Sequence, residues 1–472
     1  MPGRRSSIVI LLALLPTVCA AGPSGRNPEI EAILAAVSQE RIEARIRKLA
    51  SFHTRHTLSQ TESHTRGIGA ARRWIHAELQ QCARAAGGRL QVEFDAYIEP
   101  PGRRIPRAVE IVNVVATLPG IQPEAKERIY VVSGHYDSRA SDVMDAESLA
   151  PGANDDASGV AAVMELACVM AAHRFDATLV FMAVAGEEQG LFGAAHWAET
   201  ASKKGLDIAG MITNDIIGSP TAADGRRNER SVRLFANGLP ALLAAAQHGA
   251  SDFAQRARTE LEAIARSGGE ADTPTHQLGR HLKETAERYL PGFVVRLVPR
   301  PDRFLRGGDH LPFLERGYAA VRFTEPEEDY RHQHQDVRVE GGVQFGDLPE
   351  FVDFAYVAQV ARANAAGLAS LALAPAPPRD AGIEVVQLEN DTTLRWAANA
   401  ETDLAGYRIV WREPAMPTWR FSRDVGNVTR FTLEGISKDD FVFGVMALDR
   451  DGNASPASFP RPWRPARSAS PR

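Results

Sequence analysis

The chain has 472 residues, a length that suits two domains better than one. Hydrophobic residues make up 44% of the sequence and charged residues 24%, which is typical of globular proteins with a large core. The formal net charge of −5 lacks the basic surplus of most nucleic-acid-binding proteins, so we expect no nucleic-acid partner.

Residues 1–21 have the pattern of a secretory signal peptide. Two arginines precede an apolar run at residues 8–15, and small side chains allow cleavage near Ala20. The run is shorter than the roughly 20 residues that span a bilayer, and no later stretch is apolar enough to do so. We therefore expect a secreted or periplasmic protein without a membrane segment. Lipoprotein anchoring through Cys19 is not expected, because the residues before it fit a lipidation site poorly.

Cleavage of this leader leaves two cysteines, Cys82 and Cys168, both within helical patterns. They could be small buried apolar residues, or they could form a disulfide in an oxidising compartment. The sequence alone leaves both interpretations open.

Residues 28–373 alternate between helical and strand patterns, which predicts an α/β domain with a mixed, mostly parallel sheet flanked by helices. In such sheets, active residues lie just beyond the carboxyl ends of the strands. Helical periodicity occurs at 28–50, 67–84, 157–172, 191–200, 239–290 and 348–373, and strand patterns occur at 90–94, 110–118, 128–133, 177–185, 208–215, 294–298 and 319–323.

A proline-rich segment, residues 374–380, has the composition of a linker. Short strand patterns separated by turn residues follow over 381–460 and predict an all-β sandwich. The tail, residues 461–472, is rich in Pro, Ser and Arg and is predicted to be disordered.

The sandwich segment resembles a fibronectin type III domain. Trp396, the strand pattern at 404–410 and the pattern at 443–449 followed by Asp451-Gly452-Asn453 carry this resemblance. Such a domain could contact a polymer or a cell surface, or it could serve as a spacer or folding aid. No aromatic stripe on one face decides between these alternatives.

Histidines and carboxylates concentrate in five segments at predicted strand ends or at the start of a helix. Any one of these residues alone could be a helix cap or a solvated turn residue. Together they would repel one another unless a cation neutralised them, and oxygen and imidazole donors without thiolates suit zinc, and less well manganese or cobalt. The segments are 134–138 with His135 and Asp137, 152–159 with Asp155 and Asp156, 186–190 with Glu187 and Glu188, 214–215 with Asp215, and 332–336 with His332 and His334.

In these motifs and their order, residues from about 50 to 370 resemble the M28 family of metallopeptidases, which includes bacterial aminopeptidases. The resemblance implies the zinc exopeptidase fold and a site with two zinc ions. It implies that one zinc is bound by His135 and Asp215, the other by Glu188, and both by a bridging Asp155.

The resemblance also implies a histidine ligand to the second zinc within residues 332–336. Family members often place this ligand four residues before an aspartate, which selects His332 because Asp336 follows it. His334 is the alternative.

Two further roles follow from the resemblance. Asp137 would accept the second ring N–H of His135 and orient the imidazole. Glu187 would be the general base that takes a proton from water. The segment around Asp309 and His310 also matches the family, and there we expect these two residues to shape the site without binding metal.

The predicted function is an exopeptidase acting on peptide substrates, with aminopeptidase activity as the leading hypothesis. Carboxypeptidase relatives use basic residues to hold a substrate carboxylate, and Arg306, Arg322 and Arg331 lie near the site segments. A glutaminyl cyclase with a single zinc is a further alternative. A non-enzymatic binding protein is disfavoured, because the base and a full ligand set are present.

Overall fold

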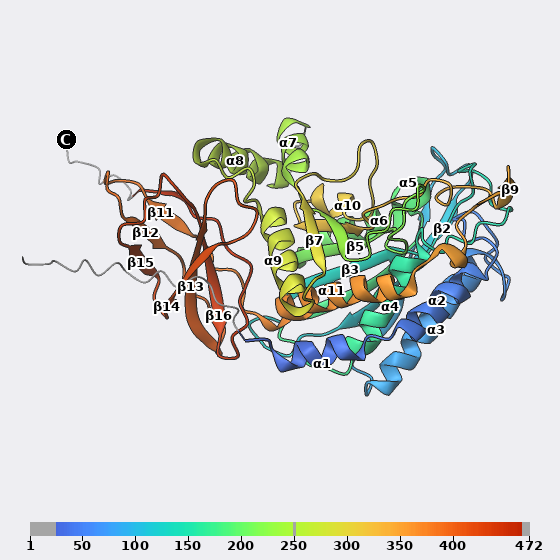
Figure 1. Cartoon of the computed structure of the whole chain (residues 1–472), viewed down its shortest axis with the longest axis horizontal. Coiled ribbons are helices and arrows are strands. Elements are labelled where there is room, and N and C mark those ends of the chain that lie inside the picture. The colour runs from blue at the N-terminus through green and yellow to red at the C-terminus, as the bar shows by residue number, and fades with distance from the viewer. Residues whose placement is uncertain (1–24, 249–251, 465–472) are drawn as a thin grey trace, which may run out of the picture.

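The computed structural model describes residues 25–248 and 252–464 and shows an α/β domain joined to a smaller β part (Figure 1). The predicted signal peptide lies outside the described residues. Within them, every helix is too short or too polar to cross a membrane.

An eight-stranded sheet forms the centre of the α/β domain, with strand order β1-β2-β4-β3-β5-β8-β6-β7. The four central strands β4, β3, β5 and β8 run parallel, so their carboxyl ends meet at one edge. This confirms the predicted mixed, mostly parallel sheet. The strands are β1 (Gln91–Glu99), β2 (Val109–Leu118), β3 (Arg128–His135), β4 (Thr178–Val184), β5 (Asp207–Asn214), β6 (Ser231–Phe235), β7 (Val294–Val298) and β8 (Ala320–Thr324).

Helices cover both faces of this sheet, which explains why its central strands are apolar at almost every position. Val132 packs into the larger core cluster with α4 and α11, whereas its neighbour Val131 packs into a second cluster with α6 and α10. In Figure 1, α1, α2, α4 and α11 run along one side of the sheet. The helices are α1 (Pro28–Ala36), α2 (Gln39–Ala50), α3 (Gly67–Ala85), α4 (Ala157–Met170), α5 (Glu187–Gly190), α6 (Phe192–Lys204), α7 (Leu239–His248), α8 (Asp252–Ser267), α9 (Pro274–Tyr289), α10 (Leu311–Leu314) and α11 (Phe354–Leu373), with a 3-10 turn, η1 (Pro349–Phe351).

The helical pattern at 28–50 is two helices rather than one. Ser38 interrupts it in an extended conformation, and its side chain caps α2 by accepting a hydrogen bond from the Arg41 N–H at 3.2 Å. The Ser38 N–H bonds to Glu165 of α4 at 2.8 Å, so the break also fixes both helices against the core.

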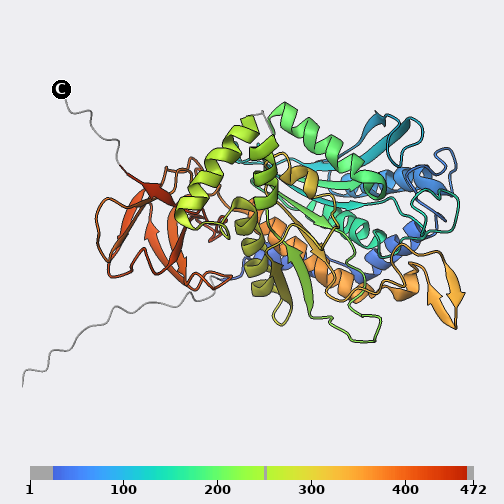
Figure 2. The same ribbon diagram turned by 90° about the horizontal axis from the view of Figure 1, so that it is seen from above.

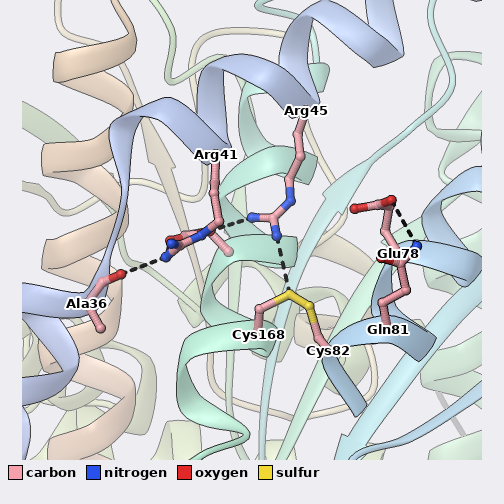
Figure 3. Close-up of a disulfide and its surroundings, with 8 residues drawn as sticks. Ala36, Arg41, Arg45, Glu78, Gln81, Cys82 and Cys168 are labelled. Atoms are coloured by element: carbon pink, nitrogen blue, oxygen red, sulfur yellow. Dashed lines mark hydrogen bonds and ion pairs between the residues drawn. A yellow bond between two sulfur atoms is a disulfide. The ribbon is translucent and has the colours of Figure 1, made fainter. Parts of the chain in front are cut away.

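Cys82 of α3 and Cys168 of α4 form a disulfide, with a Cα–Cα distance of 5.0 Å (Figure 3). The bond closes a loop across a sequence separation of 86 residues. Arg45 of α2 donates a hydrogen bond to the Cys168 sulfur at 3.3 Å. A cross-link over so long a loop stabilises the fold chiefly by restricting the unfolded chain.

The C-terminal part contains two sheets, ordered β15-β12-β11-β17 and β14-β13-β16, that enclose a shared apolar core. Trp396 and Tyr407 lie in this core with ring centroids 5.3 Å apart. The predicted all-β architecture is therefore present, and its assignment to the fibronectin type III class stays a prediction. The strands are β11 (Gly382–Glu384), β12 (Thr392–Arg395), β13 (Leu404–Arg412), β14 (Phe421–Gly426), β15 (Arg430–Leu433), β16 (Val442–Asp449) and β17 (Arg461–Trp463), and a small hairpin of the α/β domain is formed by β9 (Arg338–Glu340) and β10 (Val343–Phe345).

The start of the predicted disordered tail needs correction. Residues 461–463 form β17, which pairs in parallel with β11. Backbone pairing to an adjacent strand orders this segment in spite of its proline-rich and arginine-rich composition. Residues 465–472 lie outside the described residues.

The sandwich lies against α8 and α9 at one end of the elongated molecule (Figure 2). Asp272, which precedes α9, forms ion pairs with Arg412 of β13 at 2.7 Å and with Arg280 of α9 at 3.2 Å. All three side chains are at most 3% exposed. The two parts therefore meet over a buried surface whose charges are paired.

Candidate metal centre

The parallel strands bring the predicted site segments to one edge of the sheet. His135 is the last residue of β3 and pairs with Val184, the last residue of β4. Glu187 and Glu188 follow β4 and begin α5, and Asp215 directly follows β5. The expectation that active residues lie just beyond the carboxyl ends of parallel strands therefore locates side chains that are distant in sequence but adjacent in space.

Two groups of donor atoms lie at this edge, and within each group the donor atoms are within 4.8 Å of one another. The first group is formed by His135, Glu187 and Asp215. The second group is formed by Asp155, Glu188 and His334. Each combines one imidazole with two carboxylates, a donor set that suits zinc.

Asp155 connects the two groups. Its Oδ1 lies 3.1 Å from His135 Nε2, and its Oδ2 lies 3.0 Å from His334 Nε2. One carboxylate thus presents a different oxygen to each group, as a bridging ligand must.

Of the two histidines considered as ligands to the second zinc ion, His334 lies in the second donor group, and the preferred His332 does not. Its Nε2 is also 3.0 Å from Glu188 Oε1. The His332 ring instead stacks on Phe351, with centroids 3.6 Å apart, and its Nδ1 lies 3.8 Å from Asp329. The preference for His332 is corrected by this geometry.

Asp336, whose spacing from His332 favoured that residue as the ligand, has a different role in this fold. Asp336 Oδ1 accepts a hydrogen bond from the Ser141 N–H at 3.0 Å, and the Asp336 N–H donates to Ser141 Oγ at 2.9 Å. These two bonds attach the segment that carries His334 to the loop after β3.

Asp137 is completely buried and contacts residues of both donor groups. Its carboxylate accepts hydrogen bonds from the backbone N–H groups of Glu187 at 3.3 Å and Glu188 at 3.1 Å. Its Oδ1 is 3.6 Å from His135 Nδ1, and its backbone oxygen is nearer, at 3.2 Å. Asp137 therefore positions the Glu187-Glu188 turn as well as the imidazole.

Asp156, the neighbour of the bridging residue, caps α4 and does not point to either group. It accepts hydrogen bonds from the N–H groups of Gly159 and His135, both at 3.0 Å. A Cβ on Gly159 would lie 2.2 Å from the Asn214 oxygen, so only glycine lets α4 begin this close to β5.

Two supporting residues escaped the sequence analysis. Asp347 accepts hydrogen bonds from the backbone N–H groups of Asn154 at 2.8 Å and Asp155 at 2.7 Å, and so holds the bridging residue in place. Asp302 forms an ion pair with Arg322 at 2.9 Å. Both lie in loops whose course no local pattern indicated.

The three arginines considered as binders of a substrate carboxylate are all paired within the protein. Arg322 is completely buried and lies 2.8 Å from Asp215 as well as contacting Asp302. Arg306 pairs with Glu328 at 3.2 Å. Arg331 pairs with Asp329. Each of the three therefore already has a carboxylate partner, and Arg306 shares Glu328 with Arg233 and Arg303.

The site as a whole carries surplus negative charge. Burial raises the pKa of Glu187 well above its ordinary value, and the nearby carboxylates of Asp215, Glu188 and Asp309 add to this, although His135 opposes it. Burial likewise raises the pKa of Asp309 to about 7, and among the described residues neither of its oxygens has a hydrogen-bond partner. Bound divalent cations would supply the missing positive charge, so the residues present fit a zinc site.

The chain is similar in sequence to known peptidases. The model of peptidase family M28 matches residues 113–339, which include both donor groups. A probable zinc metalloprotease of Leptosphaeria maculans is 47% identical over 92% of this chain and 97% of its own length.

Among solved structures, the LapA aminopeptidase of Legionella pneumophila has a TM-score of 0.49 at 16% identity, covering 73% of this chain and 75% of its own. A glutaminyl cyclase of Porphyromonas gingivalis has a TM-score of 0.47 at 13% identity, covering 71% of this chain and 98% of its own. On the family match and the close relative, the chain belongs to peptidase family M28 and is a zinc metalloprotease.

Proposed function

We propose that this metalloprotease is a secreted exopeptidase with two zinc ions, and that it removes residues from the N-terminus of peptides. The observation that carries the proposal is the position of Asp155, whose two oxygens lie 3.1 Å from His135 and 3.0 Å from His334. A carboxylate between two such groups is suited to bridge a pair of ions.

The proposed ligands follow the donor groups, except that Glu187 of the first group is assigned to proton transfer. His135 and Asp215 would hold one zinc ion, Glu188 and His334 the other, and Asp155 both. Bound zinc would polarise the scissile carbonyl and lower the pKa of water. Arg322 supports this arrangement by fixing one carboxylate oxygen of Asp215 at 2.8 Å.

Glu187 is the proposed proton carrier. Its carboxylate lies within the first donor group and is not restrained by an ion pair to an arginine or lysine of the described chain. Its raised pKa, caused first by burial, favours uptake of a proton from water and its transfer to the leaving amine. Asp137 keeps Glu187 in position through the backbone bond at 3.3 Å.

Cleavage from the N-terminus is supported by the ion pairs that Arg306, Arg322 and Arg331 already form within the protein. A carboxypeptidase relying on Arg306, Arg322 or Arg331 would need to break an existing ion pair to bind its substrate. A free N-terminal amine, in contrast, would be attracted by the acidic surplus of the site.

Export to an oxidising compartment is supported by the disulfide between Cys82 and Cys168, since such bonds are rare in reducing cytosol. Fractionation of the native host, followed by N-terminal sequencing of the mature protein, would test this. Recovery of an uncleaved N-terminus in the cytosolic fraction would contradict export.

The direction of attack can be tested with zinc-loaded full-length protein and a matched set of peptides. The set contains a peptide with a free N-terminus, its N-acetylated form and a peptide beginning with glutamine. We expect stepwise release of N-terminal residues from the two peptides with a free N-terminus and none from the acetylated peptide, and two zinc ions per chain by mass spectrometry of the metal. Cleavage of the acetylated peptide would contradict aminopeptidase activity. Cyclisation of glutamine with a single bound zinc would favour a glutaminyl cyclase.

A further inference from the structure

Two arginines that the proposed function does not use converge on Glu188. Arg139, in the loop after β3, places its Nη1 4.0 Å from Glu188 Oε2. Arg104, in the turn after β1, donates from Nη1 to the backbone oxygen of Glu188 at 3.0 Å. Two segments remote in sequence thus bring positive charge to Glu188 of the second donor group.

These guanidinium groups differ from Arg306, Arg322 and Arg331, because neither of them has a hydrogen-bonded carboxylate partner within the described chain. Arg139 donates from Nε to the Ala140 oxygen at 3.1 Å and from Nη2 to the Ser141 oxygen at 2.8 Å. Among the described residues, Glu188 supplies the only carboxylate within 4.0 Å of Arg139, and Arg104 has none. Once Glu188 binds metal, its charge is shared with the ion, and the two arginines lack an anion.

The Arg139 side chain is held firmly next to the proposed second zinc ion. Its own loop fixes Nε and Nη2, and Ser141 is joined to the His334 segment by the two hydrogen bonds with Asp336. The side chain is 15% exposed, which leaves it accessible to a small ligand while most of it is removed from water. A partly dehydrated guanidinium binds a carboxylate more strongly than an exposed one.

We propose that Arg139, supported by Arg104, binds the free α-carboxylate of the residue that follows the scissile bond. The proposal rests on the proposed function, since it needs the scissile carbonyl at the donor groups. In a dipeptide the carboxylate lies one residue beyond that carbonyl, and successive residues are about 3.8 Å apart. A group that binds this carboxylate must therefore lie close to the metal ligands, and Arg139 does so, with its Nη1 4.0 Å from Glu188 Oε2. The enzyme would then favour dipeptides over longer or amidated peptides.

The test compares the dipeptide Leu-Gly with its C-terminal amide as substrates of the zinc-loaded full-length enzyme. We expect kcat/KM to be at least about tenfold higher for the free carboxylate, mostly through a lower KM, as loss of a charge-assisted hydrogen bond would predict. Arg139→Gln should abolish this preference, so that Leu-Gly and its amide are cleaved with similar kcat/KM, and Arg139→Lys should restore part of it.

The matched control is Arg174→Gln. Arg174 is exposed and precedes β4, at the edge of the sheet opposite the donor groups, so this variant should keep the full preference. Zinc content and melting temperature of each variant verify that the site is intact.

Equal cleavage of Leu-Gly and its amide by the unmodified enzyme would overturn the subsite and leave the exopeptidase function in place. Equal losses on both substrates in Arg139→Gln would also overturn it, because a structural role would not distinguish them. Failure to cleave any peptide in the set would overturn the proposed function and the subsite together.

Discussion

The metal centre and the sandwich interface both bury carboxylates, but they balance the charge differently. At the interface, Asp272 is 2% exposed and is paired with both Arg280 and Arg412. At the sheet edge, the four carboxylates of the two donor groups lie beside two histidines and the guanidinium groups of Arg322 and Arg139. The carboxylate of Asp309 has no hydrogen-bond partner among the described residues.

The difference separates a structural cluster from a functional one. A buried acid that is fully paired within the protein needs no ligand, and removing its partner costs stability. Buried acids in excess of their partners are tolerable only if something else supplies positive charge, which is the condition for a metal site. Changes at the two places should therefore affect different measurements.

Replacement of Glu187 by Gln should give the largest loss of activity. The amide keeps the size of the side chain but cannot take a proton, so kcat should fall by about 10²–10⁴-fold. Zinc content should be unchanged, because the proposed ligands remain. Turnover close to that of the unmodified enzyme would reject Glu187 as the base.

His334→Ala and His332→Ala form a matched pair at the second donor group. Loss of His334 removes the imidazole 3.0 Å from both Asp155 and Glu188, so we expect one of two zinc ions to be lost and activity to drop by more than about tenfold. The His332 variant should keep both ions, since its ring stacks on Phe351. Metal analysis after dialysis distinguishes them, and the reverse result would restore His332 as the ligand.

Arg412→Met tests the comparison at the sandwich interface, where the buried carboxylate of Asp272 is paired within the protein. It leaves Asp272 buried with one partner fewer, which should lower the free energy of unfolding by about 3 kcal/mol. Zinc content and kcat should stay near their original values, because the substitution lies outside the metal centre. Thermal unfolding with and without the second change Asp272→Asn measures the effect, and the double variant should recover part of the stability. A loss of zinc in folded Arg412→Met would show that the two regions are coupled.

Part of the metal centre could be predicted from the sequence, because strand patterns locate residues at strand ends. His135, Glu187 and Asp215 could be located because each lies at or just after the end of an apolar strand, and parallel strands bring their carboxyl ends together. His332 and His334 could not be separated in this way, because both lie in one turn after β8, and the course of that turn decides which ring reaches Asp155.

Loops and long-range pairs account for the remaining gaps. The approach of Arg104 and Arg139 to Glu188 depends on two turns with no periodic pattern. Asp272 and Arg412 are 140 residues apart, and neither has a local signal of burial. The predicted linker gave no indication that the sandwich is docked on α9, and a polymer or cell-surface contact of that domain stays a prediction.

Glu284 of α9 offers the mildest test of the interface. It accepts a hydrogen bond from the Trp419 N–H at 2.9 Å, and burial raises its pKa to about 7, with Trp419 and Arg280 acting in the opposite direction. The folded chain therefore keeps this proton up to about pH 7, whereas the unfolded chain loses it near 4.5. Stability contributed by the neutral carboxyl is present at low pH and falls as the pH rises from about 4.5 through 7.

Glu284→Gln should remove this pH dependence, because the amide stays neutral and can still accept the Trp419 hydrogen bond. The variant should be more stable than the unmodified protein at pH 8, by at most about 3 kcal/mol, and should show little difference at pH 4.5. Melting temperatures across this range measure the effect. Parallel pH profiles for the two proteins would mean that Glu284 is already ionised in the folded chain, and that Arg280 balances it as it balances Asp272.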